Sequence, residues 1–261
     1  MSKPKNKIST KARLALLSVF LLIVLLLSLR FGSAHISWRA LFSALLGREG
    51  YERYTVILYT LRLPRVLAGC LAGVGLSVSG VLLQNVTDNA LAGPNIIGVN
   101  AGAGTAILIW LVLFPRAFSL LPFAAFAGAL LTTLLILLLS ERVGASRYSI
   151  ILAGVAVTTL LGAVISAVTL LDGDLLSHYS AFSVGGFVGI GMKDLPFPAI
   201  IIAAALVSAL LYSRALDTLC LGEAGAACLG VRVRRTRLIA VACASASARS
   251  RLSRKASFTF L

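Results

Sequence analysis

The sequence contains few charged residues and very few acidic ones. Only 13% of its 261 residues are Asp, Glu, Lys or Arg, whereas a soluble globular domain carries about 25%. Lys and Arg number 24 against 9 Asp and Glu, a formal net charge of +15. That excess would suggest a nucleic-acid partner in a soluble protein, but 59% hydrophobic residues and a mean hydropathy of +0.97 exclude a water-soluble enzyme with one core. The composition indicates an integral membrane protein without a nucleic-acid partner.

Patterns for metal binding, disulfide bonding and nucleotide binding are also missing. The four cysteines form no C-x-x-C pair, and the two histidines, His35 and His178, stand far apart. Because closed metal sites need three or four converging ligands, neither a zinc site nor a disulfide framework is expected. The chain has no G-x-x-x-x-G-K-[ST] motif, so any ATP hydrolysis is expected on another polypeptide.

Six apolar stretches have about the length needed to cross a hydrocarbon core of about 30 Å as helices. They are Leu14–Leu29, Val66–Leu83, Ile96–Phe114, Leu120–Ser140, Ile150–Leu171 and Pro196–Tyr212. A seventh stretch opens at Leu238 but meets charge again at Arg249, so it is too short to span. The predicted fold class is all-α, a polytopic transmembrane helix bundle with six complete spans and the start of a seventh.

The basic residues indicate an orientation for these spans. With the N-terminus in the cytoplasm, twelve Lys and Arg fall inside, eight fall outside and four lie in the tail, which favours this orientation. The first stretch begins after a basic segment and resembles a secretory signal, but its apolar run exceeds the usual length of a signal core. We interpret it as an uncleaved first span.

Small residues predict where the helices approach closely, since helices in lipid gain little from burying leucine against leucine. The second span contains a G-x-x-x-G pair and the third repeats the spacing. The residues expected at helix contacts are Gly69, Gly73, Ser77, Gly80, Gly98 and Gly102. Contact with a solute pathway is the alternative for some of them. No ionisable residue lies near the middle of a predicted span, which argues against a proton- or ion-coupled carrier.

Two blocks of sequence together carry a family resemblance. The first, residues 61–104, contains Arg62-Leu63-Pro64-Arg65, then Ser79-Gly80-Val81-Leu82-Leu83-Gln84, Asn89-x-Leu91-Ala92-x-Pro94 and Ile97-Gly98-Val99. The second contains Leu221-Gly222-Glu223-Ala224, followed by Leu229-Gly230-Val231. In this order they resemble the FecCD-type permease subunits of bacterial ABC importers, the iron-siderophore, haem and vitamin B12 class. The resemblance extends to about Ala248.

The resemblance implies a multi-pass permease of the bacterial cytoplasmic (inner) membrane with its N-terminus in the cytoplasm. Such a subunit imports an iron chelate, either a siderophore or haem, that an extracytoplasmic binding protein delivers. A separate ATPase dimer, holding ATP and Mg, drives transport, so this chain is expected to be no enzyme and to bind no cofactor or metal. A second permease chain, identical or different, completes the assembly. Cobalamin or an oxyanion is the alternative substrate within the family.

The resemblance also implies two sets of functional residues. Arg62 and Arg65 would lie at the outer mouth of the second span and dock the binding protein, where complementary charges steer encounter. A cytoplasmic loop would contact the ATPase and transmit its motion as a rigid body; its residues are Leu221, Gly222, Glu223, Ala224, Gly225, Leu229 and Gly230. The arginines that follow would hold the next span at the headgroups; they are Arg232, Arg234, Arg235 and Arg237.

The end of the chain departs from the family pattern, whose members have ten spans. From residue 248 the sequence reads ARSRLSRKASFTFL, polar and basic where apolar residues should continue. We expect an incomplete transmembrane permease domain at residues 1–248 and an atypical tail at 249–261, out of frame or else a natural cytoplasmic tail. The alternative function is then a non-functional fragment, and we expect no transport from this chain with only its ATPase and binding protein.

A membrane-embedded hydrolase is the alternative from a different class. Residues 75–80 read GLSVSG, which superficially resembles the serine motif of an intramembrane protease. Nucleophilic catalysis needs a base within hydrogen-bond reach of the serine, and no predicted span carries a histidine. The sequence therefore disfavours this alternative.

Overall fold

The computed structural model describes residues 9–32, 34–90, 92–93, 98–115, 117, 120–144, 147–187, 189–220 and 222–249. These residues form helices and connecting turns and no strand. The chain divides into two compact units, Met1–Leu67 and Ala68–Leu261. The single permease domain expected at residues 1–248 stays a prediction, and the tail from Ser250 onward lies outside the described residues.

The described residues of the first unit form α1 (Thr10–Arg30), α2 (Trp38–Leu45), α3 (Glu52–Ile57), the π-helical turn η1 (Leu58–Arg62) and the start of the next helix. None of the residues of α1 is buried, and its leucines expose a continuous apolar surface, as suits a helix surrounded by lipid. Helix α2 begins where the Ser37 hydroxyl accepts a hydrogen bond from the Ala40 N–H at 3.2 Å, a typical N-cap. A small core, centred on Leu41 and Leu58, holds the unit together.

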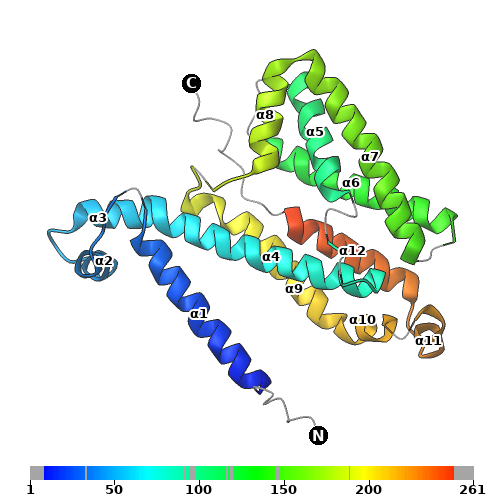
Figure 1. Cartoon of the computed structure of the whole chain (residues 1–261), viewed down its shortest axis with the longest axis horizontal. Coiled ribbons are helices and arrows are strands. Elements are labelled where there is room, and N and C mark those ends of the chain that lie inside the picture. Colours follow the sequence, from blue (N-terminus) through cyan, green and yellow to red (C-terminus); the bar gives the residue numbers. More distant parts are fainter. Residues whose placement is uncertain are drawn as a thin grey trace, which may run out of the picture. The chain divides into compact units, whose positions relative to one another are not determined.

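The second unit contains most of helix α4 (Leu63–Thr87), which begins in the last residues of the first unit. Its other elements are α5 (Val99–Leu113), α6 (Leu121–Arg142), α7 (Arg147–Leu171), α8 (Gly173–Val184), the 3₁₀ turn η3 (Met192–Asp194), α9 (Pro196–Leu211), α10 (Ser213–Leu219), α11 (Glu223–Cys228) and α12 (Val233–Arg249). Helices α5 to α8 form one bundle, and α10 and α11 lie together between the ends of α9 and α12 (Figure 1).

Each of the six predicted spans corresponds to a helix. Five helical segments are long and apolar enough to cross a membrane, and Val99–Leu113 is a shorter apolar helix. The predicted start of that third span, Ile96, lies outside the described residues. The seventh stretch is helical from Val233, ahead of the predicted Leu238. The prediction of an all-α polytopic bundle is therefore confirmed.

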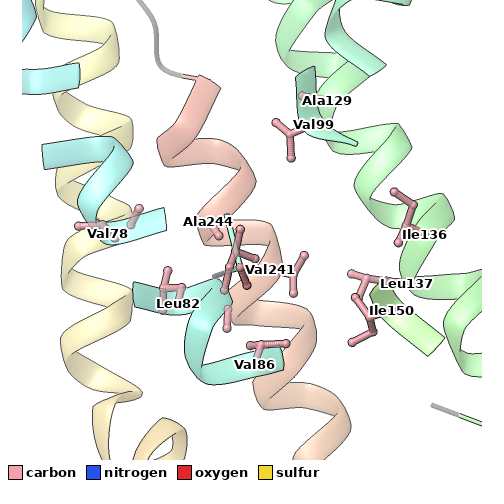
Figure 2. Packing of buried hydrophobic residues seen from close by; sticks show 14 of the residues in the cluster. Val78, Leu82, Val86, Val99, Ala129, Ile136, Leu137, Ile150, Val241 and Ala244 are labelled. Carbon is pink, nitrogen blue, oxygen red and sulfur yellow. The ribbon is translucent and has the colours of Figure 1, made fainter. Parts of the chain in front are cut away.

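The core of the second unit lies around α12. Figure 2 shows Val241 and Ala244 of α12 with Val78, Leu82 and Val86 of α4 on one side and residues of α6 and α7 on the other. Both α12 residues are fully buried. A helix that sequence reasoning describes only as the start of a span is therefore a central packing element of this unit.

Candidate functional site

Arg62 lies at the end of the π-helical turn η1 and is buried, with 8% of the residue exposed. Its Nη1 donates to the carbonyl oxygens of Leu29, at 2.6 Å, and of Arg30, and its Nη2 donates to the carbonyl of Ala34. The carbonyls of Leu29 and Arg30 belong to the last turn of α1, where no helical N–H is available to them. Arg62 therefore caps the C-terminus of α1, as basic side chains near helix ends do.

This position differs from the exposed one that docking requires. A guanidinium engaged with three backbone carbonyls in its own unit does not present its charge to a partner. Arg65, one turn further along, is exposed. Of the two arginines expected to dock the binding protein, Arg65 is the better placed, and docking by either one stays a prediction.

Replacing Arg62 by alanine is expected to loosen the end of α1. Hydrogen bonds to charged groups contribute about 1.5–3 kcal/mol each, so we expect the free energy of local opening to fall by about 2 kcal/mol, or about thirtyfold in exchange rate. Amide hydrogen exchange over residues 27–37 measures this. Arg65→Ala is the matched control, and equal exchange in the two variants would contradict the capping role.

The predicted packing glycines divide into two groups. At Gly98, whose φ of +61° few other residues adopt, a Cβ atom would lie 2.9 Å from Oγ1 of Thr158 on α7. At Gly102 a Cβ would overlap Thr132 and lie 2.8 Å from the carbonyl oxygen of Gly128, both on α6. These two glycines of the third span therefore lie at tight helix contacts.

The glycines of the second span do not lie at such contacts. Among the described residues, no heavy atom beyond the nearby backbone of α4 itself lies within 4 Å of a Cβ placed at Gly69, Gly73 or Gly80. The Ser77 hydroxyl donates to the Gly73 carbonyl within the same helix, at 2.8 Å. The stripe formed by Gly69, Gly73 and Gly80 on α4 therefore makes no close helix contact within the described part of the chain. It is free to pack against another surface. On the same helix Gly75 makes the contact instead, since a Cβ there would lie 2.6 Å from a backbone carbonyl of α12.

The predicted ATPase-contacting loop contains the short helix α11. Gly222 precedes it with φ 90° and ψ 166°, a conformation that essentially only glycine adopts. Ala226 is fully buried against the core, while Leu229 is 62% exposed. Gly230 ends the loop at φ +78°. The two special glycine conformations thus set where α11 begins and where it ends.

For the remaining loop residues, the structure describes the backbone of most but not every side chain. Gly225 lies within α11, where its carbonyl accepts the Leu229 N–H at 3.2 Å. Glu223 and Ala224 form the first turn of α11 by their backbone, and Leu221 lies outside the described residues. The ATPase-contacting role of the loop stays a prediction.

The arginines after the loop do not act as one group. Arg234 forms a bidentate ion pair with Glu141 at the end of α6, with Nε to Oε1 and Nη2 to Oε2 both at 2.6 Å. Arg237 is buried, at 8% exposed, whereas Arg232 and Arg235 are exposed. Anchoring at the headgroups therefore suits Arg232 and Arg235 but not the other two. Sequence reasoning missed the ion pair because Glu141 is 93 positions from Arg234.

A cavity of about 630 Å³ lies within the second unit, among α4 to α9. Its size falls within the range of small-molecule sites. Aromatic side chains contribute much of its lining: Phe123, Phe126, Tyr179, Phe182, Phe187 and Phe197. Lys193 and Asp194 are its charged residues, and Asp194 accepts the Gly191 N–H at 3.0 Å.

The described residues contain no group of three metal-ligating side chains, and the four cysteines are free. The serines of the protease-like segment are placed in the second span. Ser79 is fully buried, and Ser77 donates within its own helix. Neither hydroxyl has a histidine partner in the described part of the chain, so the geometry gives the hydrolase alternative no support.

Comparison with known proteins assigns the family. The FecCD transport family matches residues 20–253. The ferric enterobactin transport system permease protein FepD of Escherichia coli (strain K12) is 37% identical over 240 residues, covering 89% of this chain and 72% of FepD. The companion permease FepG of the same organism is 32% identical over 213 residues, covering 81% of this chain and 64% of FepG.

A solved structure has the same fold. It is an inward-facing conformation of a metal-chelate type ABC transporter, with a TM-score of 0.79 and 24% identity over 92% of this chain and 74% of that one. The present chain thus spans about two thirds to three quarters of the length of these three proteins. With a family match over most of its length, this chain belongs to the FecCD transport family.

Proposed function

We propose that this chain is the permease subunit of an ABC importer that moves an iron chelate of the siderophore class across the inner membrane. An extracytoplasmic binding protein delivers the chelate, and a separate ATPase dimer, which holds ATP and Mg, supplies the energy. The chain itself performs no hydrolysis and binds no cofactor. The observation that carries this proposal is the 37% identity to a ferric enterobactin permease over nearly the whole chain.

A second permease chain completes the proposed assembly. Two different permease proteins of one ferric enterobactin system both resemble this chain, which favours a heterodimer over a homodimer. The Gly69, Gly73 and Gly80 stripe on α4 is open within the described residues, and small residues suit close helix approach in lipid. We place the N-terminus in the cytoplasm, because this puts the arginine-rich loop around α11 on the side of the ATPase.

Reconstitution tests the proposal. Proteoliposomes would contain this chain, a second permease chain, the ATPase and the binding protein, and would be offered labelled ferric enterobactin, ferric citrate, haem and cobalamin in separate arms. We expect ATP-dependent uptake of an iron chelate, and no uptake when only a proton gradient is imposed. Uptake of cobalamin alone would change the substrate assignment, and absence of uptake in every arm would favour the non-functional fragment.

Reversing the charge of Arg65 is expected to weaken docking of the binding protein. Exposed ion pairs contribute about 0.2–1 kcal/mol, so we expect Arg65→Glu to weaken affinity about fivefold at low salt and less at high salt. Affinity of the loaded binding protein for the permease in nanodiscs measures this. Arg53→Glu, an equal charge reversal at another exposed site of the same unit, is the control. An equal loss in both variants would show that only net charge matters.

A further inference from the structure

We propose that the Glu141–Arg234 ion pair is a latch that carries a displacement of α11 into α6, and through α6 into α5 and α7. This inference rests on the proposed function, since the displacement comes from the ATPase. Arg234 and Glu141 are then positioning residues for transport, and they touch neither solute nor nucleotide.

The geometry of the ion pair suits the transmission of movement. Both carboxylate oxygens of Glu141 accept a hydrogen bond from the guanidinium of Arg234, each at 2.6 Å. Two parallel hydrogen bonds form only when the guanidinium and the carboxylate lie in one plane. They therefore fix the relative orientation of the two groups as well as the distance between them. A turn of the first part of α12 therefore pulls on the end of α6.

Helix α11 is joined to α12 by a short and well-bonded connection. The Val231 N–H donates to the Ala226 carbonyl at 3.0 Å, and the Gly230 N–H donates to the Ala227 carbonyl at 3.0 Å. Ala226 is fully buried, so α11 cannot slide without moving its neighbours. Helix α12 then begins at Val233, one residue before Arg234. A displacement of α11 therefore moves Arg234, because the short connection between α11 and α12 cannot stretch.

A second polar contact joins the same two helices deeper in the unit. The hydroxyls of Thr133 on α6 and Ser245 on α12 are hydrogen-bonded at 2.8 Å, and both are buried. Ser245 lies eleven residues after Arg234, or about 16 Å along the helix. With polar contacts to α6 at both points, and with Val241 and Ala244 buried between them, the first turns of α12 move together with α6.

A cavity interrupts the apolar packing beside the ion pair. It has a volume of about 450 Å³, and its apolar lining is Leu137, Ile150, Val233 and Leu238. Arg234 and Glu141 line the same cavity. Val233 and Leu238 also pack against the core that contains Leu137 and Ile150, and the ion pair adds a polar link of defined direction to this contact between the start of α12 and the end of α6.

The test uses R234Q, E141Q and the charge exchange E141R/R234E in the complete importer, with Arg235→Gln as matched control. Arg235 is the exposed neighbour of Arg234 with the same charge. We expect R234Q and E141Q to raise the ATP hydrolysed per solute imported about threefold or more, while the midpoint of thermal unfolding changes by less than about 2 °C, because an exposed pair adds little stability. The charge exchange is expected to restore coupling, and Arg235→Gln to leave it unchanged.

A second measurement separates the latch from the proposed function. In the permease chain alone, amide hydrogen exchange over residues 223–238 is expected to rise about fivefold in R234Q and to return in E141R/R234E. Unchanged exchange and unchanged coupling in R234Q would overturn the latch. So would a lower unfolding midpoint with unchanged coupling, since the pair would then act only on stability. If the wild-type importer shows no ATP-driven uptake, the proposed function fails, while the exchange measurement still decides on the latch.

Discussion

Replacing Gly102 by valine is expected to destabilise the second unit strongly. Helices α5 and α6 make the most extensive contact among the described helices, and they cross where Gly102 faces Gly128. A Cβ at Gly102 would overlap Thr132 and lie 2.8 Å from the Gly128 carbonyl oxygen, and a Cβ at Gly128 would lie 2.6 Å from the Gly102 carbonyl oxygen. Backbone atoms approach each other from both sides, so no side-chain rotation relieves the clash.

The expected size of the effect follows from overpacking. Inserting side-chain atoms into a close contact costs about 3 kcal/mol at the upper end of the usual range, which for a chain of this length lowers the unfolding midpoint by about 6–12 °C. Thermal unfolding of the chain in detergent micelles, followed by circular dichroism, measures the shift. Gly128→Val is expected to behave in the same way.

Gly73→Val is the matched control for this prediction. Gly73 belongs to a G-x-x-x-G pair with the same spacing as the pair that contains Gly102. However, no described heavy atom beyond the nearby backbone of α4 itself lies within 4 Å of a Cβ placed at Gly73. We expect no fall in the unfolding midpoint of the isolated chain. An equal fall in Gly73→Val and Gly102→Val would contradict the distinction between the two stripes.

Replacing Gly222 by alanine is expected to displace α11 and to reduce transport about tenfold. Gly222 has φ 90° and ψ 166°, a region essentially confined to glycine, in which another residue costs about 1–3 kcal/mol. The strain is relieved by a shift of the backbone at the start of α11, and a cost of about 1.4 kcal/mol corresponds to a factor of ten. Initial rates of ATP-driven chelate uptake measure the effect.

Two controls limit the interpretation of this variant. Cys228→Ala changes an exposed residue at the other end of α11 and is expected to transport at the wild-type rate. The unfolding midpoint of Gly222→Ala is expected to fall by only about 3–6 °C, because the strain is confined to one turn. If uptake were normal while the ATPase still bound, the position of α11 would not matter for coupling.

The membrane class, the approximate span positions and the family can all be inferred from the amino-acid sequence. A long run of apolar residues indicates a transmembrane helix, because every backbone N–H and C=O in the hydrocarbon core must be hydrogen-bonded within its own segment. This local rule identifies the spans, from Leu14–Leu29 to Pro196–Tyr212, without reference to their neighbours. The motifs around Arg62 and around Gly222 are likewise contiguous in the chain.

Which small or charged residues contact another helix depends on the tertiary structure. Gly73 and Gly102 have the same local signature, but only Gly102 faces another helix at close range. Arg62 and Arg65 stand in one motif, but only Arg62 caps the end of α1. In each pair the difference depends on which way a helix face turns and what lies opposite.

The ion pair on which coupling is proposed to depend could not be found from local patterns. Glu141 ends one helix and Arg234 begins another, 93 positions later. In the sequence, Glu141 and Arg234 each look like an ordinary charged residue at the membrane interface, since charged residues are common at both ends of a span. Their contact exists because α12 runs back along α6, with Ser245 bonded to Thr133 deeper in the unit. Packing of this kind is a property of the folded chain, because it depends on atoms that only the fold brings within reach.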